Sequence, residues 1–330
     1  MKHNLKITIV LLAMFLVTQF IGLYVVNYYS PVKVIDSNAV NVSAPPLPYG
    51  MDTPDIEEEL DFYRIFPSII MAFVIAISLL FLLSRFKAEF VLRLWFFGVV
   101  LIALGISFSA FFPQFKHASL IALLVALPLA IMKIYGRDLI VHNLTELFIY
   151  PGIAAVFVPI LNVWTITALL ILISIYDMWA VWHSGIMQKM AKYQINHLNI
   201  FSGFFVPYLS KKTRLKKEKM QKSRKYKTKK EFWKMFKNIK FSRQKGKKAL
   251  RKKIKVNVAI LGGGDVVFPI IAAGVMLKTL GIGSALFVIA GATIGLSYLF
   301  FLAEKKKFYP AMPFISAGIF AGMILGYLIS

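Results

Sequence analysis

The sequence predicts an all-α polytopic membrane protein with nine transmembrane helices, its N-terminus in the cytoplasm and its C-terminus outside. Three observations support this fold class. The chain is 58% hydrophobic and only 16% charged, whereas about a quarter of the residues of a water-soluble domain are charged. Nine apolar runs are long enough to cross a bilayer, which takes about twenty residues. Lysine and arginine gather in alternate gaps between these runs, as in cytoplasmic loops. We therefore expect a multi-pass protein of the cell membrane.

The nine runs carry little charge and are separated by polar or turn-forming residues. They cover residues 7–29, 65–84, 91–112, 118–135, 144–161, 163–187, 256–278, 281–303 and 308–329. The first run is too long for the apolar part of a secretory signal, and no small-residue cleavage site follows it. We expect it to be retained as a membrane anchor.

Basic residues precede the first run and follow the second, fourth, sixth and eighth. They are Lys2, Lys6, Arg85, Lys87, Arg93, Lys133, Arg137 and Lys305–Lys307, together with 25 Lys and Arg in residues 188–255. Residues 30–64, on the other side, carry seven acids. Two interpretations of this acidic outer segment stay open. The second helix begins near Asp52–Glu59 and projects beyond the membrane, or the segment is a solvated linker.

The loop at residues 188–255 has a net charge of +23, nearly all of the chain's +24. Its apolar part, residues 200–209, is too short to span and is expected to be interfacial or re-entrant. Phe232, Met235 and Phe236 recur at helical spacing among lysines, which predicts a basic amphipathic helix on anionic lipid headgroups. Such a surface attracts each basic residue by about 1 kcal/mol. Nucleic acid is an unlikely partner, because no recognition module is present.

The residues that usually hold metals or form disulfides are scarce. The chain has no cysteine, and its five histidines form no HExxH pair. This excludes disulfides and thiol chemistry and argues against a zinc protease. We expect no metal or organic cofactor.

One run contains a carboxylate beside three glycines, in Leu261-Gly262-Gly263-Gly264-Asp265. A charged group within the bilayer costs roughly 2.5–3.5 kcal/mol on insertion scales. Glycine disfavours a helix by up to about 1 kcal/mol relative to alanine, but lets another backbone approach closely. The carboxylate and the glycines are each unfavourable in a transmembrane helix, so their occurrence side by side indicates a functional site at Asp265.

A second carboxylate, Asp177, follows an apolar stretch of the sixth run. If that run ends near His183, Asp177 lies about 9 Å from the cytoplasmic boundary, and Asp265 lies about 14 Å from the same boundary. The two depths agree within about one helical turn, so the two aspartates can face each other. A third acid, Glu146, is expected to be an interfacial residue that reaches water.

Two carboxylates at close range cannot both be ionised, so they share one proton. One can deprotonate a water while the other, protonated, polarises a peptide carbonyl, as in aspartic proteases. Proton- or cation-coupled transport uses the same buried acids and stays open as an alternative. A structural protein of the lipid surface is a third reading.

A further motif lies at the start of the ninth run, Phe308-Tyr309-Pro310-Ala311-Met312-Pro313. Prolines remove backbone donors there and are expected to leave upstream carbonyls unpaired; alternatively they mark only a helix start. Together, Tyr176-Asp177, Gly262-x-Gly264-Asp265 and Pro310-Ala311-Met312 resemble the presenilin and signal peptide peptidase family of intramembrane aspartyl proteases. Met312 replaces the usual leucine. The cytoplasmic N-terminus and basic composition are most similar to an archaeal presenilin homologue.

The resemblance implies hydrolysis of peptide bonds in transmembrane substrate helices. Asp177 and Asp265 would be the catalytic pair, and the substrate would contact Tyr176, Gly262, Gly264, Pro310, Ala311 and Met312. The spans and loops divide the chain into a five-helix scaffold at 1–161, a sixth helix at 162–187, the basic loop at 188–255 and a three-helix part at 256–330.

Overall fold

The computed structural model of the protein describes most of the chain. The described residues are 5–30, 32–35, 38–41, 45–51, 54, 56, 58–86, 88–113, 115, 117–136, 138–184, 202–209, 256–303 and 309–329. The amphipathic helix predicted around residues 232–240 lies outside them. The chain has two compact units, Met1–Phe204 with Leu261–Ser330, and Phe205–Ile260. The four-part division drawn from the sequence stays a prediction.

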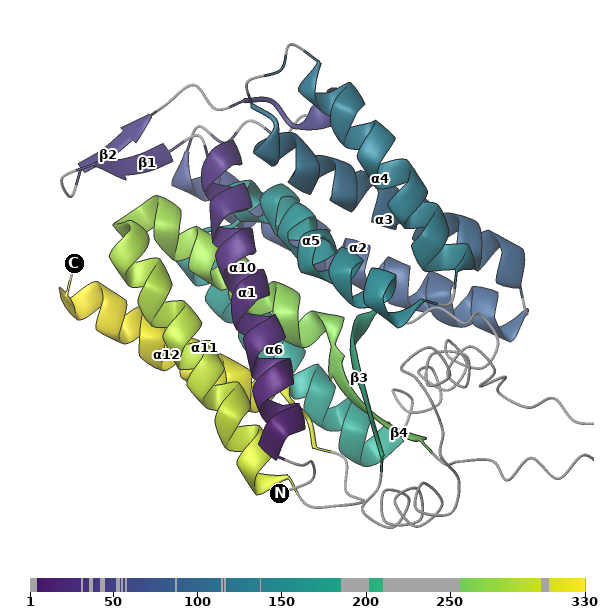
Figure 1. The fold of residues 1–330 in the computed structure, drawn as a ribbon. Coiled ribbons are helices and arrows are strands. Elements are labelled where there is room, and N and C mark those ends of the chain that lie inside the picture. Colours follow the sequence, from purple (N-terminus) through teal and green to yellow (C-terminus); the bar gives the residue numbers. More distant parts are fainter. Residues whose placement is uncertain are drawn as a thin grey trace, which may run out of the picture. The chain divides into compact units, whose positions relative to one another are not determined.

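Nine helices within the described ranges are long and apolar enough to cross a membrane, which confirms the predicted all-α fold with nine transmembrane helices; the side on which each terminus lies stays a prediction. They are α1 (Leu5–Tyr29), α2 (Glu59–Arg85), α3 (Glu89–Phe111), α4 (Ala118–Tyr135), α5 (Leu139–Phe157), α6 (Val163–Trp179), α10 (Gly263–Leu280), α11 (Ile282–Leu302) and α12 (Met312–Ile329). In Figure 1, α1 crosses the unit, and it packs against α5, α10 and α11. The start of α2 at Glu59 falls within the helix-start signal of the acidic outer segment.

The described residues also form two short sheets that the sequence did not predict. β1 (Val32–Ile35) and β2 (Asn38–Asn41) form an antiparallel hairpin, and β3 (Gly203–Leu209) pairs with β4 (Val256–Gly262). The expectation of a membrane helix over 256–278 is therefore wrong for its first seven residues. Val256, Val258 and Ile260 are β-branched, and the glycines that follow disfavour a helix before Gly263. Of the segment expected to be interfacial or re-entrant, residues 203–209 form a strand; its position at the membrane stays a prediction.

Helices α11 and α12 pack with their backbones in contact, side by side in Figure 1. Glycines make this approach possible, because a Cβ on Gly291 would meet the Gly318 carbonyl and a Cβ on Gly318 would meet that of Gly291. Glycines four residues apart allow such close packing of membrane helices. This contact holds α12, whose first residues belong to the site described below.

Replacing Gly318 with alanine is expected to destabilise the protein by about 1–3 kcal/mol, because the added methyl forces two backbones apart. The control is Gly283→Ala, since a Cβ at Gly283 meets nothing within 4 Å. Thermal unfolding in detergent measures both variants. An equal melting temperature for the Gly318 variant and the wild type would show that the helix pair tolerates a wider separation.

A half-buried lysine in the last turn of α10 links that end of the helix to the chain that follows α5. Lys278 Nζ donates to the carbonyl oxygens of Val158, at 2.8 Å, and Pro159, at 3.3 Å. It also lies 5.0 Å from the centre of the Phe62 ring. Lys278 thus adds a donor to the carbonyls of the 3-10 turn Val158–Ile160 that follows α5, where the Val158 carbonyl also accepts from the Leu161 N–H at 3.4 Å.

Candidate active site

Asp177 is placed by α6, which starts at a capping box and runs to Trp179. The Asn162 side chain accepts from the Thr165 N–H, and the Thr165 hydroxyl accepts from the Asn162 N–H, each at 2.8 Å. This reciprocal pair fixes where the helix begins. Asp177 then falls in its last turn, where the residue is only 8% exposed.

The carboxylate of Asp177 is bound by the first residues of α12. The Met312 N–H donates to Asp177 Oδ2 at 3.1 Å, and the backbone of Ala311 also hydrogen-bonds this carboxylate. The first N–H groups of a helix have no partner inside it, and this end of the helix dipole is positive. The start of α12 therefore forms a receptor for the buried Asp177 carboxylate.

Asp265 is the third residue of α10, which begins at Gly263. The N–H of Gly262, the residue that caps the helix, donates to the Asp265 carboxylate. An acidic side chain at this position reaches back to the capping residue in the same way as in a capping box. Asp265 therefore also lies at the positive end of a helix dipole, in this case that of its own helix.

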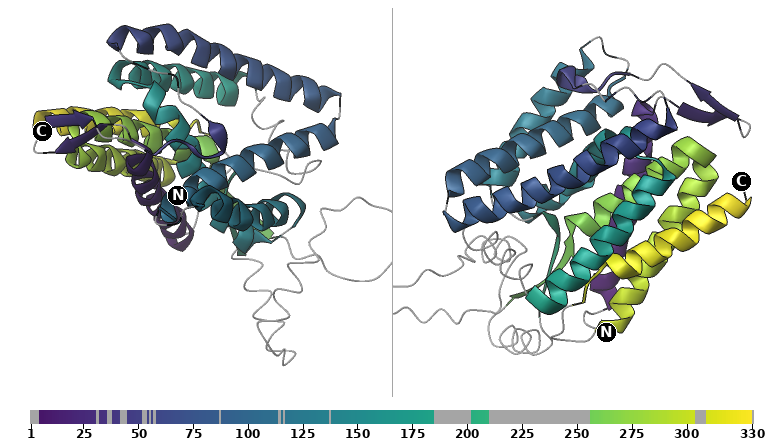
Figure 2. Two further views of the ribbon diagram at one scale, coloured as in Figure 1. Left: turned by 90° about the horizontal axis from the view of Figure 1, so that it is seen from above. Right: turned by 180° about the vertical axis from the view of Figure 1, so that it is seen from behind.

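The two aspartates belong to one site. Helices α6, α10 and α12 all contact one another, and α6 and α12 run beside each other in Figure 2. The carboxylates of Asp177 and Asp265 interact electrostatically. The amides at two helix ends offset part of the cost of burying these two acidic groups together.

Four of the six predicted substrate-binding residues contact the aspartates or directly precede residues that do, and the other two, Gly264 and Tyr176, do not. Met312 and Ala311 contact Asp177, with Pro310 buried just before them. Gly262 contacts Asp265, whereas Gly264 is exposed, and a Cβ there would have only Phe268 as a neighbour, at 3.8 Å. Tyr176 is 41% exposed, with its ring 6.3 Å from that of Trp179. It therefore does not join the contacts around Asp177.

One argument that leads to this site from the sequence is wrong in detail. The depth of Asp265 is counted along a helix from residue 256, but residues 256–262 form a strand and Asp265 is the third residue of α10. Asp177 lies in the last turn of α6, just before a π-helical turn at Ala180–Ser184. Pro310 precedes α12 and Pro313 is its second residue, positions typical of a helix start; that the prolines leave upstream carbonyls unpaired stays a prediction.

Glu146 was expected to reach water as an interfacial residue, and this was wrong. It is 1% exposed and forms an ion pair with Lys133, with 2.5 Å between Nζ and Oε1. Lys133 had been read as a loop charge, but it lies inside the helix bundle. Its partner is 13 residues away on the next helix, so no local pattern indicates the pair.

Two further contacts of the site were missed. A Cβ on Gly263 would lie 2.5 Å from Ser202 Oγ and 2.8 Å from Tyr150 Oη, so the middle glycine is the one packed against neighbours. The Ser174 hydroxyl, one turn before Asp177, donates to Ser316 Oγ at 3.0 Å. The hydrogen bond between Ser174 and Ser316 joins α6 to α12 beside the Met312–Asp177 bond. The only hint of it in the sequence is that Ser174 precedes Asp177 by three residues, about one helical turn.

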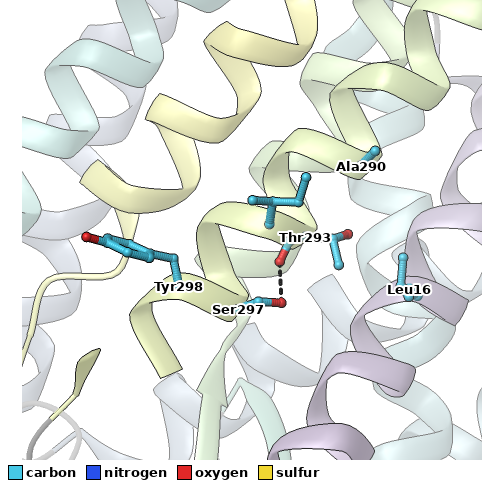
Figure 3. Close-up of a pocket in the computed structure, with 6 residues that line it drawn as sticks. Leu16, Ala290, Thr293, Ser297 and Tyr298 are labelled. Carbon is cyan, nitrogen blue, oxygen red and sulfur yellow. Dashed lines mark hydrogen bonds between the residues drawn. The ribbon is translucent and has the colours of Figure 1, made fainter. Parts of the chain in front are cut away.

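In the part of the chain that the structure describes, neither a metal-binding cluster nor the groove between α1 and α11 adds a catalytic group. Within the residues that the structure describes, no three His, Cys, Asp or Glu side chains cluster as a metal site would require. A groove of about 490 Å³ lies between α1 and α11, lined by Leu16, Ala290, Thr293, Ile294, Ser297 and Tyr298. As Figure 3 shows, the Ser297 hydroxyl is turned to its own helix, where it donates to the Thr293 carbonyl at 2.7 Å. The groove has no carboxylate.

Comparisons with known proteins agree with this arrangement. Residues 52–330 match the family described as signal-peptide peptidase, presenilin aspartyl protease. Two crystal structures of a presenilin family intramembrane aspartate protease, in space groups C222 and P2, share the fold. The first superposes with a TM-score of 0.57 at 16% identity, over 98% of this chain and 99% of that one. The second gives 0.55 at 16% identity, over 97% of both chains. No curated protein sequence is significantly similar.

The family match covers all of α2 to α12 and includes both aspartates. It confirms the resemblance drawn from the three motifs and gives no support to a transporter. With this match, and with the carboxylates of Asp177 and Asp265 held at two helix starts, the chain belongs to the signal-peptide peptidase and presenilin family of intramembrane aspartyl proteases.

Proposed function

We propose that Asp177 and Asp265 are the catalytic pair of this protease, in a site of the Gly-x-Gly-Asp type. The hydrogen bond from Met312 N to Asp177 carries the proposal, because it joins the Pro-Ala-Met segment to the first aspartate. The electrostatic interaction between the two carboxylates supports it. All three motifs of the sequence thus contribute to one set of contacts.

The reaction starts with one proton shared by the pair. The ionised aspartate takes a proton from water, whose oxygen attacks the carbonyl carbon of the substrate peptide bond. The protonated aspartate gives its proton to the carbonyl oxygen, which yields a neutral tetrahedral intermediate. As the C–N bond breaks, a hydroxyl proton of the intermediate returns to one aspartate, and the leaving nitrogen takes a proton from the other. One proton is again shared at the end.

The substrate is a transmembrane helix of another protein. Its peptide bonds are shielded by helical hydrogen bonds, so a few residues must unwind before water can attack. Gly264 supports entry from the α10 side, because the space beside it is open. Gly262, Pro310, Ala311 and Met312 lie around the aspartates, while Tyr176 would contact the substrate farther out.

Cleavage of a single-span substrate in detergent or liposomes tests this proposal. We expect two product fragments and a bell-shaped dependence of kcat on pH, because full protonation removes the base and full ionisation removes the acid. Reconstituted liposomes should show no coupled cation flux. A rate independent of pH from strongly acid to strongly alkaline conditions would contradict a shared proton.

We further propose that the basic segment binds anionic headgroups on the cytoplasmic face of the cell membrane, with the N-terminus on the same side. The segment holds most of the chain's positive charge. Replacing residues 211–253 with a neutral Gly/Ser linker of equal length is expected to leave hydrolysis in neutral detergent unchanged. In anionic liposomes the linker variant should differ from the wild type at low salt, and less so at high salt, because ions screen surface charge within about 10 Å. Loss of turnover in neutral detergent would rule out a role confined to lipid.

A further inference from the structure

A buried cluster of charged groups lies between α4 and α5, beside the catalytic machinery. Lys133 of α4 pairs with Glu146 of α5, and it also lies 3.4 Å from His142 Nδ1. His142 and Glu146 are four residues apart on the same face of α5, with 3.6 Å between Nε2 and Oε1. None of these three groups takes part in the proposed reaction.

The cluster binds both polar groups of one backbone residue, Gly203. The Gly203 N–H donates to Glu146 Oε1 at 3.3 Å, and His142 Nε2 lies 2.8 Å from the Gly203 carbonyl oxygen. Nε2 must carry a hydrogen to donate to that carbonyl, which leaves Nδ1 as an acceptor for Lys133. With a neutral His142, the Lys133 and Glu146 charges balance. We call Lys133, His142 and Glu146 the α4–α5 clamp.

The clamp continues to the start of α10. The residue before Gly203 is Ser202, whose hydroxyl lies 3.4 Å from that of Tyr150. Tyr150 is one turn beyond Glu146 on α5 and interacts with its carboxylate. The side chains of Ser202 and Tyr150 both pack directly against Gly263, so that a Cβ at this position would collide with them. Gly263 is the first residue of α10, two before Asp265.

Stability alone does not explain such a cluster. Desolvating a buried ion pair can cost as much as its attraction returns, and apolar residues of similar volume often replace it without loss. A group that must hold a backbone in one place, however, needs directed hydrogen bonds, which apolar residues cannot supply. The clamp supplies two such bonds to Gly203.

We propose that the α4–α5 clamp is a positioning device for catalysis. It fixes Gly203, and through Ser202 and Tyr150 it sets the position of Gly263 and hence of the Asp265 carboxylate. Lys133, His142, Glu146 and Tyr150 are then positioning residues for peptide-bond hydrolysis. This inference rests on the proposed catalytic role of Asp265.

Two double variants of the full-length protein test the clamp. K133M/E146L and K133M/E146Q both remove the ion pair without leaving a buried charge, but only the glutamine variant keeps an acceptor for Gly203 N–H. We expect K133M/E146L to lower kcat by about tenfold or more, because small misplacements of reacting groups are costly. Its KM should stay within about twofold of the wild type. K133M/E146Q should recover kcat to within about threefold of the wild type.

The chain offers a control in Lys278, a half-buried lysine in the last turn of α10, at the opposite end of that helix from Asp265. K278M should lower the melting temperature yet keep the wild-type kcat. Hydrogen exchange of the peptide around Gly263–Asp265 should rise in K133M/E146L but not in K278M. Equal kcat in the two double variants would overturn the proposal, as would an equal loss in K278M.

If K133M/E146L does not fold, S202A decides the question. Ser202 is exposed and its truncation leaves the ion pair intact. We expect a fall in kcat of about threefold or more with unchanged KM, and wild-type kcat would overturn the proposal. D265N is assayed in parallel. Cleavage by D265N would refute the catalytic pair itself, whereas an inactive D265N with clamp variants at wild-type rate refutes only the clamp.

Discussion

Replacing Asp265 with asparagine is expected to reduce substrate cleavage by at least about 10²–10⁴-fold, the range that general acid–base groups contribute. Asparagine keeps the shape of the side chain and an oxygen that accepts from the Gly262 N–H, but it can neither take nor carry the catalytic proton. The same loss is expected for Asp177→Asn, whose amide oxygen can still accept from Met312 N. Fragment formation from a single-span substrate measures both variants.

The control for this prediction is Asp138→Asn. Asp138 caps α5 by accepting from the Ile140 N–H at 2.8 Å, and asparagine caps a helix about as well as aspartate. This variant should cleave at the wild-type rate, and all three should elute and melt like the wild type. Turnover near the wild-type rate in Asp177→Asn would mean that the two aspartates are not a catalytic pair.

Replacing Gly263 with alanine is expected to lower kcat by about 100-fold, because a shift of about 1 Å at a catalytic group has an effect of that size. The new methyl would lie 2.5 Å from Ser202 Oγ and 2.8 Å from Tyr150 Oη. Either these side chains or the first turn of α10 must move, and Asp265 lies in that turn. The measurements are kcat, KM and the melting temperature.

Gly264→Ala provides the contrast, because its Cβ would meet only Phe268, at 3.8 Å. It should raise KM without lowering the melting temperature, since the space it fills is the proposed path of the substrate. A second substitution, G263A/S202G, removes the nearest obstacle and should restore part of the lost kcat. If G263A turned over like the wild type, the contact between Gly263 and Tyr150 would have no part in placing Asp265.

The sequence by itself predicted the nine transmembrane helices, apart from the strand at residues 256–262, and the family, and it singled out Asp177 and Asp265. These follow from local properties: a run of apolar residues needs lipid or a core wherever it lies, and a carboxylate within such a run is unfavourable whatever its partner. The order of the three motifs then indicated the presenilin-type site, which the match over residues 52–330 bears out at the level of the family.

Only the tertiary structure decided how these residues meet. The hydrogen bond from Met312 to Asp177 joins residues 135 apart, and the contact of Tyr150 and Ser202 with Gly263 joins three separate segments. Residues 256–262 are apolar enough for a helix but form a strand, because pairing with β3 outweighs composition. Hydropathy places Lys133 and Glu146 at the water boundary, yet both side chains are buried and form an ion pair with each other. Hydropathy is a sum over residues that are neighbours in the chain, so it can be read from the sequence. A hydrogen bond or ion pair forms only when the packing of the helices brings two distant groups to within about 3 Å of each other, and the sequence does not show which groups these are.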